Sequence, residues 1–118
     1  MGKQDPSFEL KFLESIVNER PNYIDALIPL AEAYTKSGRY EQGLEIDQRL
    51  SKLCLDDPVI HYNLACSLAL VGQKDQAIHT LKKAVFLGFR DKQHIQKDKD
   101  LVCLHGHPDF GQLLQELD

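Results

Sequence analysis

Cysteine and histidine side chains offer the first candidate chemistry in this sequence. Cys103, His105 and His107 lie within five residues of one another, with Asp109 close behind. One thiolate and two imidazoles are donors that suit zinc. Structural zinc sites usually pair ligands from two separated segments, and this cluster has no such second pair. A metal-binding or redox-responsive domain at Cys103, His105 and His107 is therefore an alternative hypothesis. The simpler interpretation is that Cys103 packs inward and the histidines flank a turn.

Nucleophilic catalysis would need a cysteine or serine beside a base that a third group orients. Cys66 is flanked by apolar residues, which favour an unreactive thiol, and His61 lies five positions earlier on another face of the same predicted helix. The sequence contains no G-x-S-x-G, no H-E-x-x-H and no glycine-rich phosphate loop. We therefore expect neither enzymatic activity nor a cofactor.

The composition limits the remaining classes of function. The chain has 118 residues, of which 42% are hydrophobic and 27% charged, and a formal net charge of −4. Such a chain can form a core, and its mildly acidic surface disfavours nucleic acid and anionic membranes. The longest apolar stretch, at 64–71, is too short to cross a bilayer, and the amino terminus lacks a secretory-signal pattern. Three cysteines without a C-x-x-C pair indicate reduced thiols, so we expect a cytoplasmic protein that binds neither nucleic acid nor membrane.

The pattern of apolar residues predicts an all-α fold of about six to seven helices, because they recur at spacings of three and four and strand signals are nearly absent. Helix starts are predicted at Asn22, Asp57 and His107, and helix ends at the glycines Gly38, Gly72 and Gly88. These signals place helices near residues 7–19, 22–37, 40–54, 58–71, 74–87 and 108–117, with a weaker helical segment at 92–105.

A repeat of 34 residues organises the chain, since Gly38, Gly72 and Gly106 are each separated by that distance and such a period is typical of stacked helical hairpins. Residues 24–57 align with residues 58–91 through six identities, at Leu30/Leu64, Ala31/Ala65, Gly38/Gly72, Gln42/Gln76, Leu53/Leu87 and Asp57/Asp91. A small residue at Gly43 or Ala77 would let the second helix of each unit cross the first closely.

These residues resemble the tetratricopeptide repeat (TPR) family, whose 34-residue unit is a helix-turn-helix. The resemblance is carried by Leu30-Ala31, Tyr34, Gly38 and Gly43 in the first unit and by Leu64-Ala65, Gly72 and Ala77 in the second. Residues 57–66, 84–90, 97–101 and 108–114 are similar to the closing segment of many bacterial TPR arrays. The resemblance implies one domain, a right-handed stack of antiparallel helix-turn-helix hairpins (a TPR-like α-solenoid). Its parts would be a half repeat at 8–21, repeats at 24–57 and 58–91, and a degraded closing unit at 92–118.

Some residues depart from the family pattern. His61 and Asp47 stand where the family usually has an aromatic residue, and Asp98-Lys99 occupy the Leu-Ala position of the closing unit. Because a charged pair should not pack into a neighbouring helix, we expect the closing unit's first helix to break there and to restart at Asp100 as an N-cap.

The resemblance also implies a concave groove lined by the leading helix of each unit. The expected lining residues are Asp25, Ile28, Glu32, Thr35 and Lys36 in the first unit, Val59, Tyr62, Asn63, Cys66 and Leu70 in the second, and Gln93, Gln96 and Lys97 in the closing unit. Such a groove begins acidic and becomes apolar around Tyr62 and Leu70, so it would fit a protein or peptide with an apolar anchor and a basic side chain. We therefore expect a non-catalytic protein–protein interaction adaptor.

Some TPR proteins bind the acidic carboxyl-terminal peptide of a chaperone through a clamp of Lys and Asn residues. Asn63 and Lys97 match two clamp positions, but Ile28, Glu32 and Gln93 stand where Lys, Asn and Lys would be needed. Because Glu32 would repel a carboxylate, we expect this chain not to be a chaperone-tail receptor.

A second alternative is a self-assembling structural module. The last predicted helix carries an apolar stripe of Phe110, Leu113, Leu114 and Leu117 that must pack on something. If it packs on the chain itself it would partly block the groove, and if it packs on another copy the protein would be a homodimer.

Overall fold

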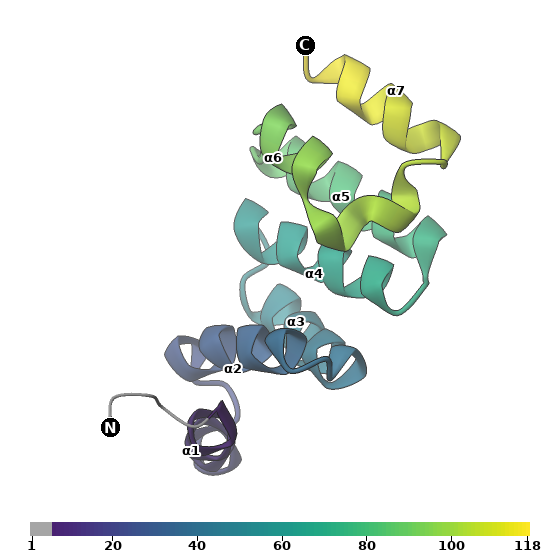
Figure 1. Ribbon diagram of the computed structural model, residues 1–118. Coiled ribbons are helices and arrows are strands. Elements are labelled where there is room, and N and C mark those ends of the chain that lie inside the picture. The colour runs from purple at the N-terminus through teal and green to yellow at the C-terminus, as the bar shows by residue number, and fades with distance from the viewer. Residues whose placement is uncertain (1–5) are drawn as a thin grey trace.

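The chain folds entirely into helices, as the spacing of its apolar residues predicts (Figure 1). The structure, a computed structural model, describes residues 6–118, and that range contains no β-strand. Its eight helical elements are α1 Pro6–Glu19, α2 Ile24–Lys36, α3 Tyr40–Leu53, α4 Pro58–Leu70, α5 Lys74–Leu87, α6 Lys92–Lys97, the 3-10 helix η1 Lys99–Leu104 and α7 Pro108–Glu116. The weak segment expected at 92–105 is therefore two short helices, α6 and η1.

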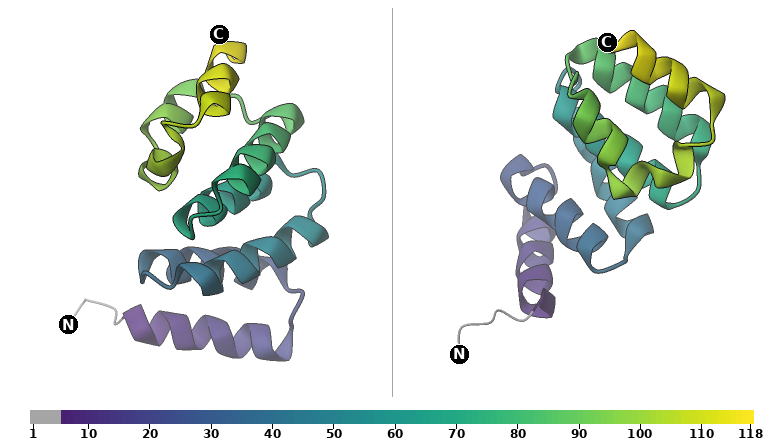
Figure 2. Two further views of the ribbon diagram at one scale, coloured as in Figure 1. Left: turned by 90° about the vertical axis from the view of Figure 1, so that its right-hand side faces the viewer. Right: turned by 45° about the horizontal axis from the view of Figure 1, so that its top comes forward.

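Helices that follow one another in the chain pack side by side in successive layers. From α1 to α5 each helix contacts the next, α4 also contacts η1, and α5 contacts both η1 and α7. Figures 1 and 2 show α1 at one end, the hairpins α2–α3 and α4–α5 in the middle, and α7 at the other end. The long axis measures 45 Å against 30 and 24 Å for the other two. This packing is consistent with a stack of helical hairpins.

Two tight turns repeat one backbone geometry at the predicted spacing. Gly38 follows α2 with φ of 79°, and Gly72 follows α4 with φ of 85°, a left-handed conformation that residues with a β-carbon rarely adopt. The amide after each glycine donates back across the turn, in the pairs Arg39 to the Tyr34 carbonyl (2.8 Å) and Gln73 to the Leu68 carbonyl (3.0 Å). The two hairpins thus share the same turn.

α3 passes close to α2 at Gly43. A β-carbon at this position would lie 3.0 Å from Thr35 Oγ1 and 3.5 Å from the Ala31 carbonyl oxygen. A larger side chain would push the two helices apart, so the small residue has the role that the sequence predicts for it.

Two hydrophobic cores hold the layers together. The first joins α1, α2 and α3 around Leu27, Leu30 and Leu50, and the second joins α4, α5, α6, η1 and α7. Ile60 of α4 packs in the first core and Leu44 of α3 packs in the second. Because each core includes one side chain from the neighbouring hairpin, the two hairpins are packed together across their interface.

The apolar stripe of the last helix packs on the chain itself. Phe110 and Leu113 are buried in the second core, and Leu114 and Leu117 are partly buried against it. α7 lies against α5, the trailing helix of its hairpin. It therefore covers the end of the stack and leaves the face formed by α2 and α4 uncovered.

Helix starts follow the sequence signals at two of three positions. Asp57 caps α4 and His107 caps α7 with side-chain atoms, as predicted. Asn22 does not cap α2, which begins at Ile24 after Tyr23 without a side-chain cap bond. The Tyr23 amide bonds back to the carbonyl of residue 20 at 3.1 Å, and this turn places Asn22 one residue ahead of the capping position.

No helix within residues 6–118 combines the length and the apolar composition that crossing a membrane requires.

Candidate functional site

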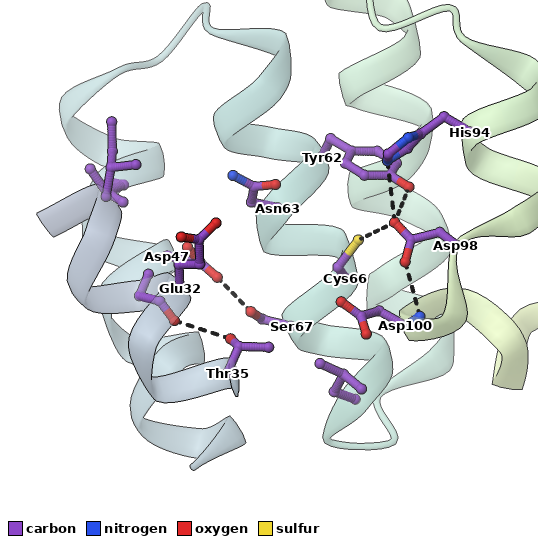
Figure 3. Close-up of a pocket in the computed structure, with 14 residues that line it drawn as sticks. Glu32, Thr35, Asp47, Tyr62, Asn63, Cys66, Ser67, His94, Asp98 and Asp100 are labelled. Atoms are coloured by element: carbon purple, nitrogen blue, oxygen red, sulfur yellow. Dashed lines mark hydrogen bonds and ion pairs between the residues drawn. The ribbon is translucent and has the colours of Figure 1, made fainter. Parts of the chain in front are cut away.

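A pocket of about 210 Å³ lies where α2, α4 and the α6–η1 segment face one another (Figure 3). These three segments are the leading helices of the units that the sequence predicts. Residues from all of them line the pocket, together with two residues of α3: Ile28, Ala31, Glu32, Thr35, Asp47, Leu50, Tyr62, Asn63, Cys66, Ser67, Leu70, His94, Asp98 and Asp100.

The structure brings together most of the residues expected in the groove. Ile28, Glu32, Tyr62, Asn63, Cys66 and Leu70 all line the pocket. Asp25 and Lys36 are exposed on α2 outside it, where Lys36 Nζ lies 3.6 Å from Glu32 Oε1. Lys97 lines a separate hollow on α6. Thr35 lines the pocket too, Val59 lies on α4 outside it, and Gln93 shares the α6 hollow with Lys97. The pocket thus includes four of the five expected residues of α4 and three of the five of α2, whereas those of the closing unit lie outside it.

The apolar middle of the groove is less accessible than the sequence predicts. Tyr62 is only 3% exposed and Cys66 only 7%. Phe89 stacks on the Tyr62 ring at a centroid distance of 4.0 Å, so Tyr62 is covered by the chain that follows α5. Tyr62, expected to line the groove, is therefore buried in it, and Ile28, 43% exposed, is the most exposed apolar side chain of the pocket.

Asp98 is the centre of the polar contacts at one end of the pocket. Its Oδ2 accepts a hydrogen bond from the Tyr62 hydroxyl at 2.6 Å and one from the Cys66 thiol at 3.7 Å. Its Oδ1 accepts the backbone N–H of Asp100 at 3.0 Å. Figure 3 shows these groups turned toward one another between α4 and η1.

The same contacts correct the expectation for the break in the closing unit. The helix does stop at Lys97 and restart at Lys99, but the cap of η1 is Asp98, not Asp100. Asp98 also packs against α4 after all, because Tyr62 and Cys66 supply donors to a carboxylate that could not enter an apolar interface.

Burial and nearby carboxylates disfavour the negatively charged forms of Cys66, Tyr62 and Asp100. Burial first, and the carboxylates of Asp98 and Asp100 next, raise the pKa of the Cys66 thiol well above its ordinary value. Burial also raises the pKa of Tyr62. The pKa of Asp100 is raised by burial and then by the charge of Asp98. A protonated Cys66 is an unreactive thiol. The Nε2 of His61, the nearest histidine along α4, bonds to the Leu55 carbonyl at 2.9 Å.

A buried carboxylate lies at the α3 side of the pocket. Asp47 is 5% exposed and accepts a hydrogen bond from the Ser67 hydroxyl at 2.5 Å. Burial raises the pKa of Asp47 to about 6, partly offset by the bond from Ser67. This pair joins the two hairpins through a polar contact at a position where the TPR family usually has an aromatic residue.

The pocket is acidic. Its lining includes the carboxylates of Glu32, Asp47, Asp98 and Asp100, and no lysine or arginine is among its lining residues. Outside the lining, Lys36 lies 3.6 Å from Glu32, and a cationic ligand would add further positive charge to the pocket.

Cys103, His105 and His107 do not converge. Cys103 is exposed and donates to the Ala69 carbonyl at 3.3 Å, and the His105 ring stacks on Phe110. His107 Nε2 lies 3.0 Å from Asp75 Oδ1. Among residues 6–118, one set of three metal-ligating side chains lies within 4.8 Å of one another, and it is Cys66, Asp98 and Asp100.

Sequence reasoning missed five lining residues with polar side chains, namely Asp47, Ser67, His94, Asp98 and Asp100. Asp47 and Asp98 had a signal, since both interrupt the repeat pattern with a charge. Ser67 and His94 had none, because only the packing of α3 on α4 and of α6 on Tyr62 brings them to the pocket.

Neither a protein-family model nor a curated protein matches this chain.

Proposed function

We propose that this protein is a non-catalytic, cytoplasmic adaptor of the TPR type that binds a basic segment of a partner protein in the pocket between α2, α4 and η1. The observation that carries the proposal is the acidic lining of this pocket, with four carboxylates and no lysine or arginine. An ammonium or guanidinium group of a partner would find charge-assisted hydrogen bonds there.

The rim of the pocket suits the rest of such a segment. Ile28 is exposed and Leu70 half-buried, so an apolar side chain next to the basic one would lose water on binding. Asn63 is exposed on the same helix as Leu70 and can both donate to and accept from a peptide backbone. This combination favours a peptide with alternating basic and apolar character.

The repeat architecture is part of the proposal. The shared turn at Gly38 and Gly72, the close crossing at Gly43 and the layered packing support a TPR-like array. A right-handed superhelix follows from the same assignment.

A capture experiment with matched charge variants tests this function. Glu32→Lys places a positive charge on the pocket rim, whereas Glu41→Lys places the same charge on α3 at an exposed residue outside the pocket lining. Partners captured from lysate by the unchanged protein should be lost with Glu32→Lys and kept with Glu41→Lys. An identical set of partners for both variants would refute the assignment of the pocket.

An acidic peptide ending in EEVD provides the opposite probe. Because the pocket lacks basic residues, it should not bind such a peptide at micromolar concentration. Measurable binding in a fluorescence polarisation titration would contradict both the charge argument and the exclusion of a chaperone-tail receptor.

Self-association is the second candidate function, and the observation that favours it lies on α1. Phe8 and Phe12 are 66% and 56% exposed, and their rings stack at 6.4 Å. A pair of open aromatic rings is a common mark of a protein interface. Light scattering over a range of concentrations tests it, since a constant monomer mass would exclude this candidate.

A further inference from the structure

We propose that Cys66, His94, Asp98 and Asp100 form a binding site for a divalent metal ion of the zinc class. The ligand atoms of Cys66, Asp98 and Asp100 all lie within 4.8 Å of one another, and His94 Nε2 lies 3.5 Å from Asp98 Oδ2. This site goes beyond the adaptor function, and it differs from the Cys103, His105 and His107 cluster that the sequence offers.

The composition of the ligand set is that of zinc. One sulfur, one imidazole nitrogen and two carboxylate oxygens are the donor types that zinc accepts, in the number that a tetrahedral site needs. The donors also come from separated segments, because Cys66 lies on α4 whereas His94 lies on α6 and both aspartates lie at or in η1. The pairing of two segments that structural zinc sites usually show is therefore present in the fold.

The measured distances fit a shared metal. With a Zn–S bond of about 2.3 Å and Zn–N and Zn–O bonds of about 2.0 Å, tetrahedral ligands lie about 3.5 Å apart for S···O and about 3.3 Å apart for N···O. The corresponding separations are 3.7 Å from Cys66 Sγ to Asp98 Oδ2 and 3.5 Å from His94 Nε2 to Asp98 Oδ2. Both agree to within a few tenths of an ångström. Cys66, Asp98 and Asp100 form the close set, and the exposed His94 ring must turn toward them to become the fourth ligand.

Outer contacts already orient these donors. Asp98 receives the Tyr62 hydroxyl on Oδ2 and the Asp100 amide on Oδ1. The His94 ring packs edge-on against Tyr62 and Phe89 at centroid distances of 5.4 and 5.9 Å. Contacts of this kind orient the ligands of known metal sites.

Charge and access also favour a cation at this position. The two carboxylates face a pocket whose lining includes no lysine or arginine. All four donors line that pocket, so an ion can reach them from solvent. On binding, the Cys66 S–H bond breaks, its proton passes to solvent and the sulfur forms the bond to the metal. The ion would occupy the α4–η1 end of the pocket, whereas Glu32 and Asn63 lie toward α2 in Figure 3.

Cobalt titration tests the site without any partner protein. The purified protein is stripped with EDTA and titrated with Co²⁺, whose bond to a thiolate gives a charge-transfer absorption in the near ultraviolet, and Zn²⁺ is then added in competition. We expect one equivalent of Co²⁺ to produce this band and Zn²⁺ to abolish it. A protein that gives no band, or a band only with large excess of Co²⁺, overturns the proposal.

Matched variants assign the ligands. Cys66→Ser should abolish the band, and Asp100→Asn or His94→Gln should weaken Zn²⁺ binding by about tenfold or more. Cys103→Ser is the control, because Cys103 is the exposed thiol outside the cluster, and it should leave the band unchanged. A band that survives Cys66→Ser, or that disappears with Cys103→Ser, places the metal elsewhere and overturns the assignment.

The design distinguishes a missing metal site from an unfolded variant and from a wrong adaptor function. His94 is exposed, so His94→Gln keeps the fold even if Cys66→Ser perturbs it, and circular dichroism verifies this. Because the titration contains no peptide or partner, its failure leaves the adaptor function standing. The capture experiment is carried out with EDTA, so that a metal at Asp98 and Asp100 does not change the charge of the pocket.

Discussion

Replacing Asp47 with Asn should stabilise this protein at neutral pH. The Asp47 carboxyl is 5% exposed between α3 and α4, and burial raises its pKa from 3.8 to about 6. Above pH 6 the folded protein therefore carries a charge that the unfolded chain solvates better. A difference of about 2 pKa units costs about 3 kcal/mol of folding free energy. Asn keeps an oxygen for the Ser67 hydroxyl and removes the charge, so we expect a gain of about 1–3 kcal/mol at pH 7.5.

The sign of the pH dependence follows from the raised pKa. Between pH 6 and pH 3.8 the folded state binds more protons than the unfolded state, so the cost is present in full above pH 6 and shrinks as the pH falls. At pH 4 the advantage of Asp47→Asn should be below about 1 kcal/mol. Ser67→Ala should act in the opposite direction, because it removes the hydroxyl donor from the ionised carboxylate. It should therefore destabilise the protein more at pH 7.5 than at pH 4.

Urea unfolding followed by circular dichroism measures these differences at both pH values. Asp25→Asn is the matched control, because Asp25 is an exposed aspartate on α2, and it should change the free energy of unfolding by less than about 0.5 kcal/mol. The reasoning is refuted if Asp47→Asn destabilises the protein at pH 7.5, or if its effect is the same at pH 7.5 and pH 4.

Three further substitutions test local features of the fold. Asp57→Ala should destabilise by about 1 kcal/mol in urea unfolding, because the Asp57 side chain accepts two backbone N–H groups at the start of α4. Gly72→Ala should destabilise the protein by about 1–2 kcal/mol, because Gly72 has a φ of 85°. Gly106→Ala, at a glycine without positive φ, should have a smaller effect. Equal effects of the two substitutions would contradict the turn argument. In ultraviolet titration, Tyr34 should ionise near pH 12, because burial and its hydrogen bond to Glu14 raise its pKa, and Glu14→Gln should bring that transition down.

The sequence was sufficient for features that depend on local pattern. The 34-residue spacing predicted the paired turns at Gly38 and Gly72, because a left-handed turn requires glycine at a fixed place after each leading helix. The small residue at Gly43 predicted the close crossing of α2 and α3. Proline and a capping side chain likewise predicted the starts of α4 and α7. Each of these signals acts within one turn or one helix pair.

The solvent exposure of the groove residues could not be predicted from local pattern. Tyr62 has the position of a groove residue, and its burial comes from Phe89, which follows α5 and folds back over its ring. The degraded closing unit has no regular pattern from which that return could be derived. The cluster around Asp98 had the same difficulty, because Cys66 and Asp98 are 32 residues apart and meet only through the packing of η1 on α4.

The departures from the repeat pattern are the residues that give the pocket its chemistry. In the tetratricopeptide pattern that the sequence resembles, position 47 would be aromatic and position 98 a leucine, and both would then be part of an apolar interface. With carboxylates there, the interface must supply polar partners, and it does so through Ser67, Tyr62 and Cys66. Carboxylates at Asp47 and Asp98 weaken the packing and raise the energy of the folded protein while the site is unoccupied. They are therefore hard to explain as residues that stabilise the fold. A cationic occupant would offset that cost, and the proposed basic ligand and the proposed metal ion both rest on these same irregular positions.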